Sequence, residues 1–236
     1  VTMNCNYRCT YCFEKEHLCT NEYMTTETAD EVISFIKRKY KEHQFKNKLQ
    51  IEWFGGEPLL NMPIIRYISN ELKSSNICYD ACMYTNGRLL TKDIAFELSE
   101  LGVNKSVVIT LDGLAQTYSK LKQCTEKDFY TVLENIKAVK DILDIKIRLN
   151  ISDESKNDIE ELYELLTKKY EIQKNKISLY GIKQYNKDIG VSNYSNATSN
   201  FINDFMNRHN IKKSLLRRSY GCSIRNKNYY CIYTNG

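Results

Sequence analysis

Short apolar runs alternate with amphipathic stretches along the whole chain of 236 residues. Runs rich in β-branched residues and bounded by polar residues predict strands, and they lie at residues 1–3, 49–54, 81–85, 106–111, 145–151 and 176–182. Between them, apolar residues recur with the i, i+3, i+4, i+7 spacing of a helix that buries one face. This pattern predicts helices over residues 29–40, 64–72, 94–101, 132–143 and 159–166.

The alternation of strand and helix predicts an α/β fold with parallel strands and crossover helices. Two architectures satisfy it: a partial (β/α)6 barrel like an incomplete TIM barrel, or an open doubly wound sheet. Both place ligands at the carboxyl ends of the strands. We expect the barrel over residues 1–183, a polar linker and a helix near 201–206 within 184–219, and the start of a small cysteine-containing extension over 220–236.

Composition narrows the class of protein. Hydrophobic residues make up 42% and charged residues 27%, as in ordinary globular proteins, and no apolar run is long enough to cross a bilayer. The net charge of +5 is small and scattered, so nothing indicates a nucleic-acid groove. Nine cysteines is an odd number, and a chain of this length does not need disulfides to stabilise its core, which favours free thiols in a reducing cytoplasm.

Three of these cysteines fall within eight residues. Cys5, Cys9 and Cys12 have the spacing C-x3-C-x2-C, with no fourth cysteine at a matching interval. A structural zinc site needs four ligands, and His17 or Cys19 could supply the fourth, although the resulting spacing is unusual for zinc. The alternative is an iron–sulfur cluster, in which three thiolates would leave one iron open. That asymmetry favours an active site.

Polar or glycine-containing clusters follow the other predicted strands at the same end. The clusters are Gly55-Gly56-Glu57-Pro58, Thr85-Asn86-Gly87 and Thr110-Leu111-Asp112-Gly113, and Arg148 and Asn150 lie late in the fifth strand. The two adjacent glycines allow close approach of a backbone to a ligand, and the glutamate offers a carboxylate to a cation. Each cluster alone is an ordinary turn. Their common position at the carboxyl ends of parallel strands predicts one composite site.

The order of these motifs resembles the radical S-adenosylmethionine (radical SAM) enzymes over residues 1–183. The resemblance implies that Cys5, Cys9 and Cys12 ligate a [4Fe-4S] cluster whose fourth iron chelates S-adenosylmethionine. It also implies where parts of S-adenosylmethionine bind: the adenine beside Tyr11 and Phe13, the ammonium at Gly55, Gly56 and Glu57, the ribose or carboxylate near Asn86, Thr110 and Asp112, with Arg148 and Asn150 completing the pocket.

One loop departs from the family pattern. Relatives commonly carry a His-Asp pair and then an arginine after the Asp-Gly motif, where this chain has Tyr118, Ser119 and Lys122. If the family's arginine pairs with a carboxylate, Lys122 is a weaker substitute because an ammonium cannot bind it bidentately. We interpret this loop as diverged.

The remaining cysteines suggest an extension. Tyr220-Gly221-Cys222 resembles the start of the extension that binds auxiliary iron–sulfur clusters in the SPASM branch of these enzymes. Cys222 is therefore a candidate auxiliary [4Fe-4S] ligand in the full-length protein. We interpret Cys231 as a buried or reactive thiol. Cys78 and Cys82 are interpreted as small buried hydrophobic residues.

The resemblance implies an enzyme that cleaves S-adenosylmethionine reductively and abstracts hydrogen from a peptide or protein, most simply in maturing a ribosomally synthesised peptide. Maturation of an anaerobic sulfatase is the alternative within the class. Flavodoxin or ferredoxin would donate electrons, and no membrane or nucleic acid is expected. A zinc-binding interaction module is the alternative outside the class. A hydrolase is disfavoured because none of the three histidines accompanies a nucleophile motif.

Overall fold

The computed structural model describes residues 1–12, 14, 22–43, 48–182, 184–186, 191–193, 195–211 and 230–235. Its main sheet contains β1 (Leu49–Trp53), β2 (Tyr79–Thr85), β3 (Ser106–Leu111), β4 (Ile145–Ile151) and β5 (Ile177–Gly181). The α-helices are α1 (Thr26–His43), α2 (Met62–Ser74), α3 (Lys92–Glu100), α4 (Ala115–Lys122), α5 (Glu126–Val139), α6 (Ile159–Glu164) and α7 (Asn196–Arg208). A short antiparallel pair, β6 (Gln184–Asn186) and β7 (Val191–Asn193), precedes α7.

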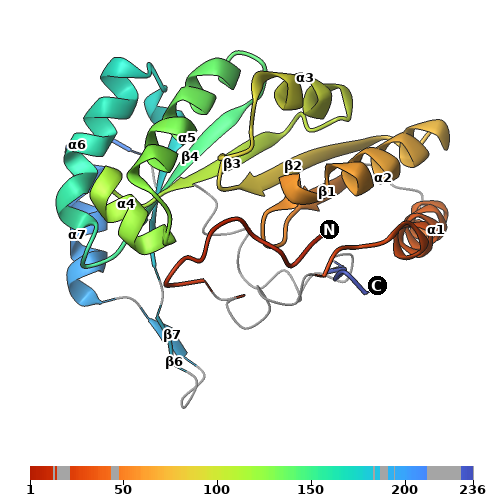
Figure 1. The fold of residues 1–236 in the computed structure, drawn as a ribbon, viewed down its shortest axis with the longest axis horizontal. Helices are drawn as coiled ribbons and strands as arrows, with labels where there is room; N and C mark the ends of the chain where they lie inside the picture. The colour runs from red at the N-terminus through yellow and green to blue at the C-terminus, as the bar shows by residue number, and fades with distance from the viewer. Residues whose placement is uncertain are drawn as a thin grey trace.

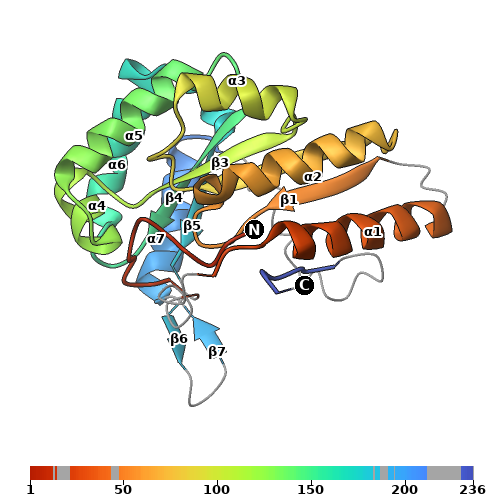
Figure 2. The same cartoon turned by 45° about the vertical axis from the view of Figure 1, so that its right-hand side comes forward.

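The five strands of the main sheet are all parallel and lie in the order of the chain, β1-β2-β3-β4-β5. A doubly wound sheet reverses its strand order at a switch point, whereas a barrel winds in one direction. The described sheet therefore has the partial-barrel topology. Helices such as α2, α3 and α5 lie along one side of it (Figures 1 and 2).

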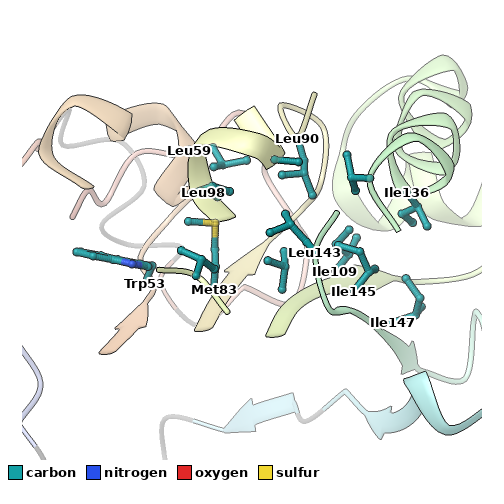
Figure 3. Packing of buried hydrophobic residues seen from close by; sticks show 14 of the residues in the cluster. Trp53, Leu59, Met83, Leu90, Leu98, Ile109, Ile136, Leu143, Ile145 and Ile147 are labelled. Carbon is teal, nitrogen blue, oxygen red and sulfur yellow. The ribbon is translucent and has the colours of Figure 1, made fainter. Parts of the chain in front are cut away.

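The core lies between the sheet and these helices. Residues that alternate along the central strands β2, β3 and β4, such as Met83, Ile109 and Ile147, are completely buried there. They pack with helix residues such as Leu98 and Ile136 (Figure 3). The intervening strand positions are only half-buried, as at Ser106, Val108 and Thr110 of β3. This period of two means that Thr110, Arg148 and Asn150 project from the face opposite the core.

The expected first strand does not join the sheet. Among the described residues, the main sheet has five strands instead of six, and residue Thr2 forms only an isolated antiparallel bridge with Tyr23. The backbone of this segment is already engaged, because the Met3 N–H donates to the Glu22 carbonyl and the Met24 N–H to that of Val1. The prediction of a strand at residues 1–3 was therefore wrong, because backbone groups of this segment bond to Glu22 and Met24 instead of to a strand of the main sheet.

Other elements also differ from the expectation. Helix α4 occupies the loop interpreted as diverged. The polar linker expected before the helix near 201–206 contains the β6–β7 pair and the first turn of α7. The helix predicted over residues 132–143 begins earlier, at Glu126, where Thr125 and Asp128 form a capping box, and it ends at Val139.

The described end of the chain lies against α1. The Tyr230 ring packs edge-on against Phe35 at 4.9 Å, and the Thr234 hydroxyl donates to the Glu22 carboxylate at 3.1 Å. In the part of the chain that the structure describes, no helix is long and apolar enough to cross a membrane.

Candidate active site

The chain's own amino-terminal segment packs against the Gly55-Gly56-Glu57 turn that follows β1. The Gly56 N–H donates to the Thr2 carbonyl at 2.9 Å, and the Glu57 N–H donates to that of Asn4 at 2.7 Å. A Cβ atom at Gly56 would overlap the Asn4 carbonyl oxygen, and Gly55 has a φ of +146°. The close approach that these glycines permit is therefore to residues 2–4, which lead directly into the cysteine loop.

The cysteine loop is fixed on its other side by the end of α4. The Thr10 N–H donates to the Leu121 carbonyl at 2.8 Å, and the Arg8 N–H donates to the Lys122 carbonyl at 3.1 Å. Carbonyls in the last turn of a helix have no partner within the helix, so they are free to accept these bonds. The two donors flank Cys9, and the loop is thereby attached to both the β1 turn and α4.

Cys5, Cys9 and Cys12 are free and half-buried. Burial raises the pKa of all three thiols, that of Cys9 to about 11. Negative charge on Cys5 or Cys12 would raise the pKa of Cys9 further. The three sulfur atoms are thus within electrostatic range of one another. Among the described residues, no three histidine, cysteine or acidic side chains converge as ligands of a single metal ion. A cubane differs in that each thiolate binds its own iron, and three thiols on one fixed loop fit that donor set.

Glu57 connects the glycine turn to the end of β2. Its carboxylate is completely buried and accepts hydrogen bonds from the Leu59 N–H at 3.1 Å, the Thr85 hydroxyl at 2.7 Å and the Asn86 N–H at 2.8 Å. Burial raises the pKa of this carboxyl, although the three donors act against that shift. Oxygen Oε2 accepts only the Asn86 bond among those described, so it retains capacity for another donor.

Asn86 connects the same strand end to the cysteine loop. Its Nδ2 donates to Asn6 Oδ1 at 2.7 Å and lies 3.8 Å from the Cys5 sulfur. Its Oδ1 accepts the Arg88 N–H at 3.0 Å, which holds the amide in this orientation.

A buried polar cluster joins the ends of β3 and β4, the cysteine loop and α4. Asp112 is completely buried and accepts hydrogen bonds from the Tyr11 hydroxyl and, at 2.9 Å, from the Asn150 amide. The Lys122 ammonium lies 3.3 Å from Asp112 Oδ2 and donates to the Thr110 hydroxyl at 2.8 Å. We call these five residues the Asp112 cluster.

Lys122 therefore has the carboxylate partner that the sequence left uncertain. Burial acts to lower the pKa of its ammonium, but Asp112 and the neighbouring cysteines outweigh it and the pKa is raised. The lysine is accordingly charged. Burial also raises the pKa of the Tyr11 hydroxyl, as does the adjacent Asp112, so Tyr11 remains a neutral donor.

Arg148 lies beside this cluster on the sheet face opposite the core, paired in register with Thr110. Its guanidinium stacks on the Tyr180 ring at 3.6 Å from the centroid. Its buried Nε has no hydrogen-bond partner among the described residues, and burial lowers its pKa. An unpaired buried donor of this kind suits an anionic ligand group.

The structure thus brings together most of the residues selected from the sequence: Cys5, Cys9, Cys12, Tyr11, Gly55, Gly56, Glu57, Asn86, Thr110, Asp112, Arg148 and Asn150. Phe13 and Cys222 lie outside the described residues, as do His17 and Cys19. Cys78 is exposed and Cys82 half-buried, so their interpretation as buried hydrophobic residues was wrong. Cys231 is exposed, which excludes the buried alternative.

Sequence reasoning gave Lys122 no assigned place in the site. The spacing of Ala115, Tyr118 and Leu121, which are all buried on α4, could have indicated this helix. The polar residues between them made the helical pattern hard to recognise. The cavity of about 470 Å³ lined by α4, α5 and α6 residues such as Thr117, Phe129 and Glu161 lies apart from these groups.

Comparison with known proteins gives the same picture at the level of family and fold. Residues 1–166 match the sequence profile of the radical SAM superfamily. A GTP 3',8-cyclase of Clostridium perfringens is 32% identical over 207 residues, covering 82% of this chain and 58% of the relative. The radical SAM cyclopropyl synthase TigE of Paramaledivibacter caminithermalis is 27% identical over 184 residues, covering 65% of this chain and 39% of the relative.

Among solved structures, native anSMEcpe with bound AdoMet superposes with a TM-score of 0.63 at 19% identity, covering 82% of this chain and 53% of the other. This similarity confirms the α/β partial-barrel fold. The chain spans about half the length of the relatives it matches. Several of the curated relatives are named as cyclases of GTP and not as peptide maturases.

Proposed function

Because this chain belongs to the radical SAM superfamily, whose enzymes use a [4Fe-4S] cluster and S-adenosylmethionine, we propose that Cys5, Cys9 and Cys12 hold that cluster. The observation that carries the proposal is the attachment of the cysteine loop to the Gly55-Gly56-Glu57 turn on one side and to α4 on the other. The loop therefore carries three free thiols next to the buried Asp112 cluster.

When bound, the reduced cluster and S-adenosylmethionine would supply reductive cleavage of the sulfonium and radical abstraction of hydrogen from the substrate. The chain binds and orients. Oxygen Oε2 of Glu57 can accept a hydrogen bond from the methionyl ammonium next to Gly55 and Gly56. The unpaired Nε of Arg148 can donate to the carboxylate.

The remaining polar residues shape the nucleoside side of the pocket. Thr110, Asp112 and Asn150 offer hydroxyl, carboxylate and amide groups toward the ribose, and Asn86 fixes the cysteine loop beside them. Tyr11 and Phe13 would border the adenine. Since most of these groups already bond to one another, the pocket is preorganised and ligand binding costs little side-chain entropy.

For the substrate we propose a peptide or protein, with maturation of a ribosomally synthesised peptide before sulfatase maturation. The support is the Tyr220-Gly221-Cys222 sequence, typical of the SPASM branch, and the similarity to TigE and to anSMEcpe, which has been solved with a peptide. The corresponding organisation is a barrel over residues 1–183, a connection over 184–219 and the start of an auxiliary-cluster domain over 220–236, with Cys222 as one ligand.

A second candidate is a reaction on GTP. The relatives named GTP 3',8-cyclase are 32–33% identical to this chain, against 27% for TigE, and the chain spans 44–58% of their length. Either reaction needs a reductant. We propose flavodoxin or ferredoxin for that role, in the reducing cytoplasm that free cysteines suit.

The source of the hydrogen taken by the enzyme distinguishes these candidates. Cells of the source organism grown in deuterated water would be lysed, and the extract divided into a peptide and protein fraction and a nucleotide fraction. Each fraction would be incubated with reconstituted protein, unlabelled S-adenosylmethionine and reductant. We expect deuterium in 5'-deoxyadenosine from the first fraction only. Transfer from the nucleotide fraction, reproduced with GTP deuterated at C3', would replace the peptide proposal by the second candidate.

A further inference from the structure

We propose that Lys122 is a positioning residue whose buried positive charge raises the reduction potential of the cluster, with Asp112 acting in the opposite direction. The inference rests on the proposed cluster at Cys5, Cys9 and Cys12. It concerns the ease with which that cluster accepts an electron.

The first observation is burial of the charge. The Lys122 side chain is 2% exposed and its Asp112 partner 0%. Among the described residues, Lys122 is the only buried lysine or arginine. A charge removed from water is screened much less by solvent and salt than a surface charge, so it acts at longer range.

The second observation is its location relative to the thiols. The Lys122 ammonium lies 3.5 Å from the hydroxyl of Tyr11, the residue between Cys9 and Cys12. A positive charge next to the loop that carries the ligands favours a cluster carrying one more electron.

The third observation is that one helix end sets this geometry. The carbonyls of Leu121 and Lys122 hold the loop on either side of Cys9, while the Lys122 side chain turns into the Asp112 cluster. The hydroxyls of Thr110 and Tyr11 and the Tyr118 ring, 5.3 Å from the ammonium, leave the charge little freedom to move away. The lysine and the loop therefore keep a fixed separation.

The test is a redox titration of the reconstituted full chain without S-adenosylmethionine, followed by the electron paramagnetic resonance of the reduced cluster. A unit charge about 10 Å away, at an effective dielectric constant of about 20, changes an equilibrium by about tenfold, or about 59 mV for one electron. We expect Lys122→Met to shift the reduction potential to a more negative value by about this amount. Asp112→Asn should shift it to a less negative value. Lys122→Arg keeps the charge and should restore the wild-type potential.

Lys120→Met is the matched control, because Lys120 lies on the same helix with 72% exposure and pairs with Glu154 at 2.9 Å in solvent. Its potential should equal that of the wild type. Unchanged potentials in Lys122→Met and Asp112→Asn, or shifts in the same direction, would overturn the inference. If Lys122→Met does not fold, a less negative potential in Asp112→Asn is still required. Failure of the wild type to bind any cluster would instead overturn the proposed function.

Discussion

Single residues decide how the cysteine loop is held. Because Gly56 has no side chain, the backbone of Asn4 can lie against it, and the Asn4 carbonyl accepts a hydrogen bond from the Glu57 N–H. The sequence indicated close approach of a backbone at this turn, but the approaching group is the protein's own chain. Glu57 likewise fixes two strand ends, since its donors come from the turn after β1 and from the end of β2.

Gly56→Ala should displace residues 2–4, because the added Cβ would overlap backbone atoms that have no rotamer with which to avoid it. We expect the free energy of unfolding to fall by about 1–3 kcal/mol and iron binding after reconstitution to fall in proportion. Urea denaturation and iron analysis measure the two effects. Full stability with full iron content would show that the segment does not pack on the turn.

The Lys122–Asp112 pair gives a second prediction at this scale. Removing one partner leaves a buried charge without compensation, so Lys122→Met should cost about 3–5 kcal/mol in the apoprotein. The double variant Lys122→Met/Asp112→Leu removes both charges and should recover most of that loss. Denaturation of the wild type, both single variants and the double variant gives the coupling energy. Additive losses would mean that the two groups do not interact.

Secondary structure elements carry these residues to one edge. Strands β3 and β4 have the bounds predicted from their β-branched runs, because alternation of apolar residues and burial against helices coincide there. The segment 1–3 was wrongly predicted as a strand of the sheet, since its backbone bonds to Glu22, Met24 and Gly56 and not to a neighbouring strand. Helix α4 was missed because its buried face includes Lys122, whose partners Thr110 and Asp112 are supplied by the fold.

The start of α5 provides a prediction with a definite pH dependence. Burial acts to raise the pKa of the Asp128 carboxyl, but hydrogen bonds from Thr125 and the adjacent Arg88 outweigh it and lower the pKa. A lowered pKa stabilises the protein above the unfolded value, about 3.9, and this contribution is lost as the pH falls through the folded value. Asp128→Asn should therefore destabilise the protein by about 1 kcal/mol at pH 7 and by less near pH 3.

Urea denaturation of the wild type and Asp128→Asn at the two pH values measures this difference. The exposed Asp141, for which a matched Asp141→Asn variant can be made, is the control and should show little effect at either pH. An equal loss for Asp128→Asn at pH 7 and pH 3 would contradict an electrostatic role for the carboxylate.

At the scale of the whole molecule, the site exists because the parallel strands end at one edge of the sheet and the amino-terminal loop lies against that edge (Figure 1). Motif order along the chain was sufficient to predict this edge and twelve residues that meet there. The links between them were not predictable, because the bonds of Asn86 to Asn6 and of Tyr11 to Asp112 join residues 80 and 101 positions apart. Phe13 and Cys222 stay predictions.

The central claim is that this edge binds a cluster that cleaves S-adenosylmethionine. The most direct measurement is anaerobic reconstitution with iron and sulfide, addition of S-adenosylmethionine and dithionite, and quantification of 5'-deoxyadenosine. We predict that the wild type forms it and that Cys9→Ala forms none above background, while Cys78→Ala, at an exposed cysteine away from the loop, retains the wild-type amount. Equal yields from the wild type and Cys9→Ala would contradict the account.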